Sequence, residues 1–411
     1  MNKFFAAMLS ILFLIVAAVP AMATDTRQIS LGYVGNYIED DYNIFTWYAT
    51  LPSYTNTVWL GLEYELYYYE TEDFGPSGSY SYMGASYGLG KEAKYGTLAM
   101  FYYNYGAPLN TFGGEAFTET PNTKWSVLYA YPMDKISLGF YFNRADRSQK
   151  NEDEDGTVYE HAVGYTTLGA GIRFDLGEKA YADLALDYNM GSYKDDNYSY
   201  SAYGEVTEDA NTMLGIRGRM FYEWNETITL VPYVSYRFFD FSYKADSAEA
   251  WKDEYWGVKG SNITLGIGAN VKVNEDNLLI FAVEPYDYYK YEPSDPAAGV
   301  DIEYTYTYLP TMYLALESDV KDWLTFRAGA QKYFYKTKQD YTEDEDESKY
   351  TYTDSGYNFT MGLGFHIGDF DIDAYINNNL PFRLGYWLTG YQEYYNEYDA
   401  PVYQLTALYH F

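Results

Sequence analysis

Apolar and polar residues alternate with a period of two through most of this chain, and this alternation restricts its fold more than any other feature. Over residues 263–273, Ile, Leu, Ala and Val occupy every second position, and Thr, Gly, Asn and Lys fill the positions between them. Residues 324–331 and 357–367 repeat the pattern. Because successive side chains of a strand point to opposite faces, each stretch predicts a strand with one apolar face and one small or polar face.

The links between these stretches are alternately short and long. The short links cover residues 89–94, 132–135, 176–179, 223–226, 274–277, 318–322 and 367–369. The long links cover residues 70–78, 106–122, 146–161, 192–210, 244–260, 292–301, 336–354 and 377–401. The pattern predicts an all-β, antiparallel up-and-down transmembrane barrel over residues 58–411, with about sixteen strands, short periplasmic turns and long acidic extracellular loops.

Composition supports the barrel over two other β-rich classes. Aromatic residues are 21% of the chain, 54 of the residues are Tyr, and the mean hydropathy is only −0.40. This mixture is typical of barrels with an apolar lipid face, a polar lumen and aromatic girdles. A soluble sandwich would also alternate, but the unequal links argue against it, and the periodicity argues against a fibrous tyrosine-rich chain.

The first 23 residues have the pattern of an export signal. Lys3 precedes an apolar run over residues 4–19, and Ala21 and Ala23 form an Ala-x-Ala cleavage site. The run is shorter than the roughly 20 residues that a membrane-spanning helix needs, which argues against a permanent anchor. We therefore predict a signal peptide over residues 1–23, cleavage after Ala23 and export to the outer membrane.

The last ten positions, 402–411, alternate like the other strands and end on an aromatic residue. This segment resembles the terminal strand of Gram-negative outer-membrane β-barrel (porin-like) proteins. In that superfamily, the terminal strand is the signal that the barrel-assembly machinery reads. The resemblance implies that machinery as a partner, with Tyr409 and Phe411 as the assembly signal.

Residues 24–57 do not follow the hairpin rhythm. Residues 28–36 could form an extra strand, and the whole segment could also be a periplasmic tail. The stretch 39–52 is similar to the N-terminal stretch of putative porins related to the fatty-acid transporter group, although the Asn-Pro-Ala motif that is usual there is missing. That resemblance implies a segment that enters the barrel as a plug.

Charged residues fall on the face opposite the apolar set, which predicts a lumen of mixed charge. A charge at mid-depth on the lipid face costs about 2–4 kcal/mol, so the polar face is expected to be wet. Such charges could set up a field that sorts solutes, or form salt bridges that only rigidify a narrow lumen. The inward candidates are Glu63, Glu65, Lys135, Arg173, Asp183, Asp187, Arg217, Arg219, Arg237, Lys272, Arg327, Asp371 and Asp373.

The net charge of −32 and the acidic loops indicate possible partners. Asn151, Asp153 and Asp155 place oxygen donors two residues apart before Gly156, which is how a helix-loop-helix calcium loop begins, but Ala162 stands where its closing Glu would be. These three residues are therefore a candidate calcium site, and the alternative is a solvated acidic loop that binds Ca²⁺ or Mg²⁺ loosely together with outer-membrane lipid and glycolipid. The acidity argues against nucleic acid as a partner.

The sequence predicts a channel rather than an enzyme. There are three His and no Cys, and no nucleophile pattern or metal-ligand spacing accompanies the His residues. The main prediction is a porin-like channel for small hydrophilic solutes, without a cofactor. The alternatives are a hydrophobic-substrate transporter with an N-terminal plug, and a closed structural or adhesive barrel. No sequence patch argues for an oligomer.

Overall fold

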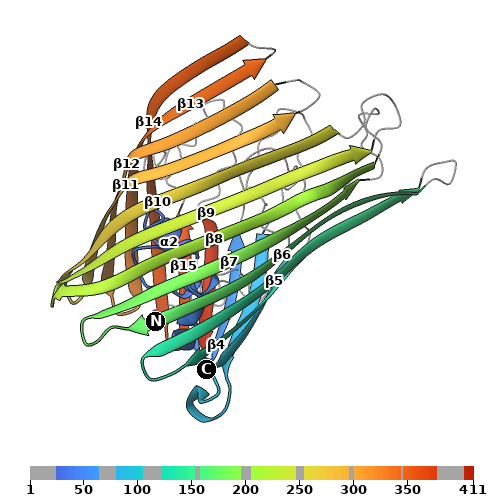
Figure 1. Cartoon of the computed structure of the whole chain (residues 1–411). Coiled ribbons are helices and arrows are strands. Elements are labelled where there is room, and N and C mark those ends of the chain that lie inside the picture. Colours follow the sequence, from blue (N-terminus) through green and yellow to red (C-terminus); the bar gives the residue numbers. More distant parts are fainter. Residues whose placement is uncertain are drawn as a thin grey trace, which may run out of the picture.

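The structure is a computed structural model that describes residues 25–63, 80–104, 123–152, 158–195, 205–246, 254–295, 300–343, 346–376 and 402–411. Sixteen antiparallel strands form one closed barrel in which each strand pairs with its neighbours in sequence (Figure 1). The strands are β1 (Thr57–Glu63), β2 (Tyr80–Gly88), β3 (Thr97–Asn104), β4 (Thr123–Pro132), β5 (Ile136–Glu152), β6 (Val158–Asp175), β7 (Ala180–Asp195), β8 (Glu205–Asn225), β9 (Ile228–Asp246), β10 (Glu254–Asn274), β11 (Asn277–Asp295), β12 (Val300–Lys321), β13 (Leu324–Glu343), β14 (Asp346–Ile367), β15 (Phe370–Ile376) and β16 (Val402–His410).

The barrel closes between its first and last strands. Thr57 of β1 lies opposite His410 of β16, and the backbone N–H of Phe411 donates to the carbonyl of Asn56 at 3.0 Å. The predicted all-β up-and-down barrel is therefore confirmed, and so is its strand number. The resemblance to outer-membrane barrel proteins holds at the level of architecture.

The limits of several predicted loops were wrong. Residues 336–354 were predicted as a long loop, yet β13 and β14 stay paired up to Glu343 opposite Asp346. Much of 146–161 and 292–301 is also strand. These strand ends carry polar residues on both faces, so the apolar alternation stops while the backbone pairing continues.

The wall has an apolar outer face and a polar inner face. Large exposed side chains such as Leu186, Ile216 and Phe238 alternate with buried polar ones such as Asp187 and Ser235. A water-soluble protein has the reverse arrangement, so this wall suits lipid outside. Within the described residues, no helix is long and apolar enough to cross a membrane.

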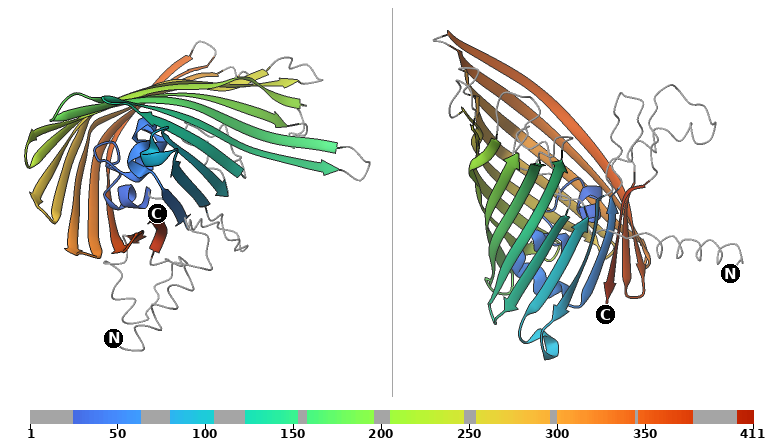
Figure 2. Two further views of the ribbon diagram at one scale, coloured as in Figure 1. Left: turned by 90° about the horizontal axis from the view of Figure 1, so that it is seen from below. Right: turned by 90° about the vertical axis from the view of Figure 1, so that its right-hand side faces the viewer.

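Residues 25–54, which we call the inner segment, lie inside the barrel (Figures 1 and 2). The inner segment contains the helix α2 (Asp25–Ser30) and the 3-10 helices η1 (Asp41–Phe45) and η2 (Tyr48–Tyr54). A third 3-10 helix, η3 (Lys91–Ala93), lies in a turn of the wall. The helical α2 corrects one sequence-based alternative, a strand over residues 28–36.

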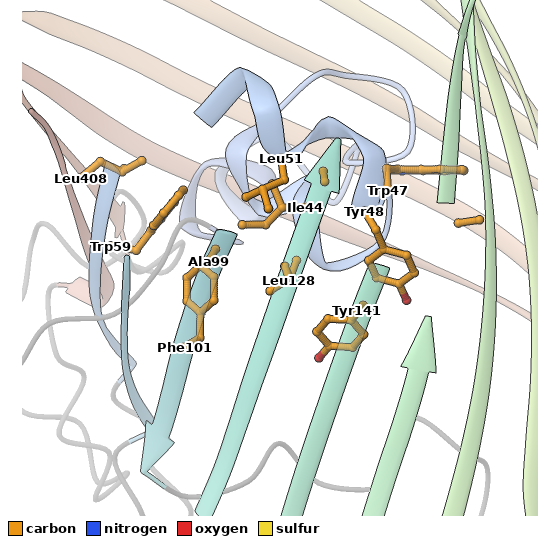
Figure 3. Packing of buried hydrophobic residues seen from close by; sticks show 12 residues of the cluster. Ile44, Trp47, Tyr48, Leu51, Trp59, Ala99, Phe101, Leu128, Tyr141 and Leu408 are labelled. Atoms are coloured by element: carbon orange, nitrogen blue, oxygen red, sulfur yellow. The ribbon is translucent and has the colours of Figure 1, made fainter. Parts of the chain in front are cut away.

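Two buried hydrophobic clusters join the inner segment to the wall. In the first, Trp47 and Leu51 pack with Trp59, Phe101 and other wall residues (Figure 3). In the second, Leu31, Val34, Tyr37 and Ile38 pack against the inner faces of β8 to β12. The inner segment thus belongs to the core of the molecule.

Candidate functional site

Glycines on the inner face of the wall let the backbone of the inner segment approach closely. A side chain at Gly329 would overlap backbone atoms of Leu31 and Gly32, and one at Gly139 would overlap backbone atoms of Tyr48. Gly169, Gly266, Gly268 and Gly362 hold the same kind of position beneath inner-segment side chains. The small residues that alternate along the strands therefore form a seat for residues 25–54.

Arg27 anchors the start of the inner segment to the wall. Its guanidinium donates to both carboxylate oxygens of Glu317 at 2.8 Å and to Asp40 Oδ2 at 2.7 Å. Glu317 also accepts from Arg327 Nε at 2.6 Å, and Arg327 pairs with Asp373. Burial lowers the pKa of Arg27, but Glu317 and Asp40 raise it, and the balance lies well above its usual value. Arg27 is therefore charged in this network, which we call the Arg27 network.

A second network centres on Asp183, which is buried on β7. Asp183 accepts from Arg173 Nε and Nη2 at 2.7 and 2.9 Å and from Arg219 Nε at 3.0 Å. Both arginines also reach the inner segment, because Arg173 donates to Glu39 at 2.8 Å and Arg219 donates to the carbonyl of Ile38 at 2.9 Å. One wall carboxylate thus orients two arginines that hold the middle of the inner segment.

Tyrosines of the inner segment reach carboxylates of the wall. The hydroxyl of Tyr48 donates to Asp187, which also pairs with Arg217. The hydroxyl of Tyr37 donates to Glu284 at 2.9 Å, and Tyr313 donates to the other oxygen of the same carboxylate at 2.9 Å. Each carboxylate is buried and accepts hydrogen bonds, as buried polar groups require.

No family model matches this chain, and no curated protein matches it. Solved structures give matches of low identity. The CymD monoaromatic hydrocarbon channel matches at 10% identity over 94% of this chain and 97% of its own, with a TM-score of 0.41. The Pseudomonas putida toluene transporter TodX matches at 11% identity over 95% and 96%, with a TM-score of 0.36. The copper transporter OprC matches at 11% over 78% and 66%, with a TM-score of 0.37.

The structure brings most of the predicted lumen charges together. Arg173, Asp183 and Arg219 meet in one network, Asp187 meets Arg217, and Arg327 meets Asp373. Asp371 lies instead at the end of the wall that carries the short turns, between His366 and His410. Arg237 faces the lumen without a carboxylate at ion-pairing distance among the described residues. Lys135 is exposed beside a turn, and Lys272 lines a pocket.

Five of the predicted site residues have no described side-chain environment. The side chains of Glu63 and Asn151 are not described, and Glu65, Asp153 and Asp155 lie outside the described residues. No group of three acidic or histidine side chains that could hold a metal ion occurs in the described ranges. The ring of Tyr409 contacts the rings of Phe370 and Phe411, and the role of Tyr409 and Phe411 in assembly stays a prediction.

The sequence-based list missed the carboxylates that face the inner segment most directly. Glu317 alternates with outward leucines along β12, so the alternation of the sequence could have predicted that it faces the lumen. Glu284 precedes a register shift near Pro285, and this shift breaks the alternation. No local sequence pattern indicates the role of Arg27, because its partner Glu317 is 290 positions away in the chain.

A pocket of about 590 Å³ lies between the inner segment and the wall, on the side of the short turns. Its lining includes Arg27 and Glu39 of the inner segment together with Arg173, Asn270 and Lys272 of the wall. The pocket therefore borders both the Arg27 and the Asp183 networks.

Proposed function

We propose that the protein is an outer-membrane channel for small solutes that its own inner segment keeps closed. The apolar outer face of the wall and the polar inner face support a position in lipid. The predicted signal peptide and terminal strand agree with export to the outer membrane. Passage of a solute then requires the inner segment to move.

One observation carries this proposal: residues 25–54 lie in the lumen on a glycine seat, held by the Arg27–Glu317 ion pair and by the hydrogen bond from Arg219 to the carbonyl of Ile38. A sixteen-stranded barrel of this kind is wide enough to leave an aqueous channel unless something fills it. A permanently open porin is therefore supported less well than a gated channel.

Conductance in planar bilayers tests the proposal. The mature chain should show rare or no openings, and deletion of residues 25–54 should give stable ohmic channels. The deletion variant must first show the circular dichroism of an intact β-barrel in detergent. If the folded deletion variant conducts no better than the full mature chain, the proposal fails, and a closed structural or adhesive barrel becomes the better account.

A hydrophobic-substrate transporter with a lateral exit is a second candidate, favoured by the seam between β1 and β16. Among the described pairings, these strands share one register pair, Thr57 opposite His410, whereas β15 and β16 pair from Phe370 opposite Tyr409 to Ile376 opposite Val402. A wall with few ladder hydrogen bonds parts more easily.

A cross-link across this seam tests the second candidate. The register of Thr57 and His410, if continued, would place Leu60 opposite Ala407, and the chain has no Cys of its own. Oxidation of a Leu60→Cys/Ala407→Cys variant should slow liposome uptake of a hydrophobic dye if the dye leaves through the seam. Unchanged uptake by the oxidised protein would rule out that exit.

A further inference from the structure

Among the described residues, Arg237 forms no ion pair within the networks of the lumen. Arg237 lies on the inner face of β9, opposite Gly215 on one side and Asn262 on the other. Arg173, Arg217, Arg219 and Arg327 all pair with carboxylates, whereas no described carboxylate forms an ion pair with Arg237. A half-buried guanidinium without a counter-ion is uncommon and suggests that its partner comes from outside the chain.

A carboxylate in the neighbourhood of Arg237, that of Asp287, is occupied by other side chains. Asp287 of β11 accepts from Asn262 Nδ2 at 2.7 Å and from Thr264 Oγ1 at 3.0 Å. These bonds hold Asp287 against β10, and its charge acts on Arg237 only from beyond ion-pairing distance. Asp287 is therefore not an ion-pair partner of Arg237.

Unused donors gather at one point of the wall. The Nε–H groups of Arg217 and Arg237 are both buried, and neither donates a hydrogen bond within the described part of the chain. Gly215 lies between them, and a Cβ atom there would be 3.2 Å from Asp187 Oδ2, 3.6 Å from Arg217 Nη2 and 3.7 Å from Arg237 Cγ. A Cβ atom at Gly215 would thus touch Asp187, Arg217 and Arg237 at once, so these three side chains converge over the glycine. A buried donor without a partner costs about 1–3 kcal/mol, so an acceptor bound there would be favoured.

Aromatic rings border the same place. Phe239 follows Arg237 on the inner face of β9, and its ring stacks on Tyr289 of β11 at 5.8 Å. Tyr289 lies opposite Asn262 in register, so this half-buried ring is a close neighbour of Arg237. Tyr165 on β6 is also near enough to interact electrostatically with both arginines. A planar ring can pack against such side chains.

We propose that Arg217 and Arg237 bind the carboxylate of a small solute whose planar ring rests against Tyr289. Guanidinium groups match a carboxylate with two parallel hydrogen bonds. The neighbouring Asp187 disfavours a second negative charge, so a monoanion fits better than phosphate. This inference rests on the proposed function, because it names the class of solute that the channel takes up.

The site is also connected to the closed state. Arg217 pairs with Asp187, and Asp187 accepts the hydroxyl of Tyr48 in the inner segment. An anion bound to Arg217 competes with Asp187 for the same guanidinium. Solute binding therefore weakens one of the contacts that hold the inner segment.

Calorimetric titration of the mature chain in detergent with benzoate tests the site. We expect saturable binding that Arg237→Gln weakens by roughly 10-fold or more, as loss of a charged hydrogen-bond donor implies. Arg237→Lys should recover part of the affinity. Arg144→Gln, which removes an arginine of β5 that bonds to Thr166, should bind benzoate like the unaltered chain.

Three other probes complete the titration. Benzamide, which keeps the ring but not the charge, and acetate, which keeps the charge but not the ring, should each bind more weakly than benzoate. Phosphate should also bind more weakly. The proposal is overturned if benzoate does not bind, if Arg237→Gln binds it unchanged, or if any of these three probes binds as tightly. Since binding is measured without a membrane, failure of this site is distinct from failure of the channel proposal.

Discussion

At the scale of single residues, the charges of the lumen act mainly as ties between the wall and the inner segment. Glu317 joins Arg27 of the inner segment to Arg327 of β13, and Asp183 joins Arg173 to Arg219. Removing one partner from such a buried set leaves the others uncompensated, and this usually costs about 3–5 kcal/mol. The networks are therefore the points at which the closed state is most sensitive to substitution.

Glu317→Gln should loosen the inner segment. Arg27 and Arg327 both lose their shared carboxylate, and we expect more frequent openings of the mature chain in planar bilayers, with a destabilisation of about 3 kcal/mol. Lys259→Gln is the matched control, because it breaks a more exposed pair with Asp240 that contributes about 1 kcal/mol at most. Equal opening frequencies for the two variants would contradict the role of Glu317.

Two of the three histidines of the chain hold the end of the barrel with the short turns together. Asp371 accepts from His366 at 2.6 Å and from His410 at 3.2 Å, and the His410 ring also hydrogen-bonds Thr57 across the seam at 3.1 Å. This chain of bonds links β14 to β1 through β15 and β16.

Asp371→Ala should lower the melting temperature of the barrel in detergent. The group is partly exposed, so we expect a cost of about 1 kcal/mol and a shift of roughly 2 °C. Asp369→Ala is the control, because its side chain makes no interaction with the described residues. If the two variants melt at the same temperature, Asp371 does not fasten the seam.

At the scale of elements, the strands could be predicted from the sequence, but the partners of the inner segment could not. Alternation along 263–273 depends on local side-chain direction, so it reports which residues face inward. The contact of Arg27 with Glu317 depends on how the barrel folds back on itself, and no local pattern records it. The resemblance of residues 39–52 to a plug segment predicted a position in the lumen, but it predicted none of the contacts with the wall.

The strand limits were missed for a different physical reason. β13 and β14 continue to Glu343 and Asp346 because backbone hydrogen bonds persist above the apolar band. There, polar residues occupy both faces of the strand, so a period of two no longer distinguishes one face from the other in the sequence. The length of the alternating stretch therefore reports only the part of a strand that faces lipid. It is shorter than the full length of the strand.

Gly329→Val should displace the first turn of the inner segment. The new side chain would enter the space of Leu31 and Gly32, whose backbone has nowhere to retreat without leaving the wall. Arg27 is the single trypsin site within 24–57, so rapid tryptic cleavage after Arg27 is the expected readout.

Ala328→Val is the matched control for this substitution, because Ala328 is adjacent to Gly329 on β13 and its side chain points to the opposite face of the wall. Its Arg27 should stay as protected as in the unaltered chain. Equal protection of Arg27 in both variants would show that the glycine seat does not hold the inner segment.

At the scale of the whole molecule, a closed lipid-facing wall surrounds a folded segment in its lumen. The hydrophobic clusters, the glycine seat and the ion networks together involve strands all around the wall, and all contact residues 25–54. Their combination supports the proposed closed channel over a permanently open pore. The central claim is that this segment blocks conduction while it contacts the wall.

A reversible cross-link tests that claim most directly. Ser137 Oγ donates to the carbonyl of Ala49 at 3.0 Å, so an Ala49→Cys/Ser137→Cys pair joins η2 to β5 in a chain without other Cys. The measurement is bilayer conductance of this oxidised variant before and after a reductant is added. We expect no conductance while the disulfide is intact and channel openings once it is reduced. Steady conduction with the disulfide fully formed would contradict it.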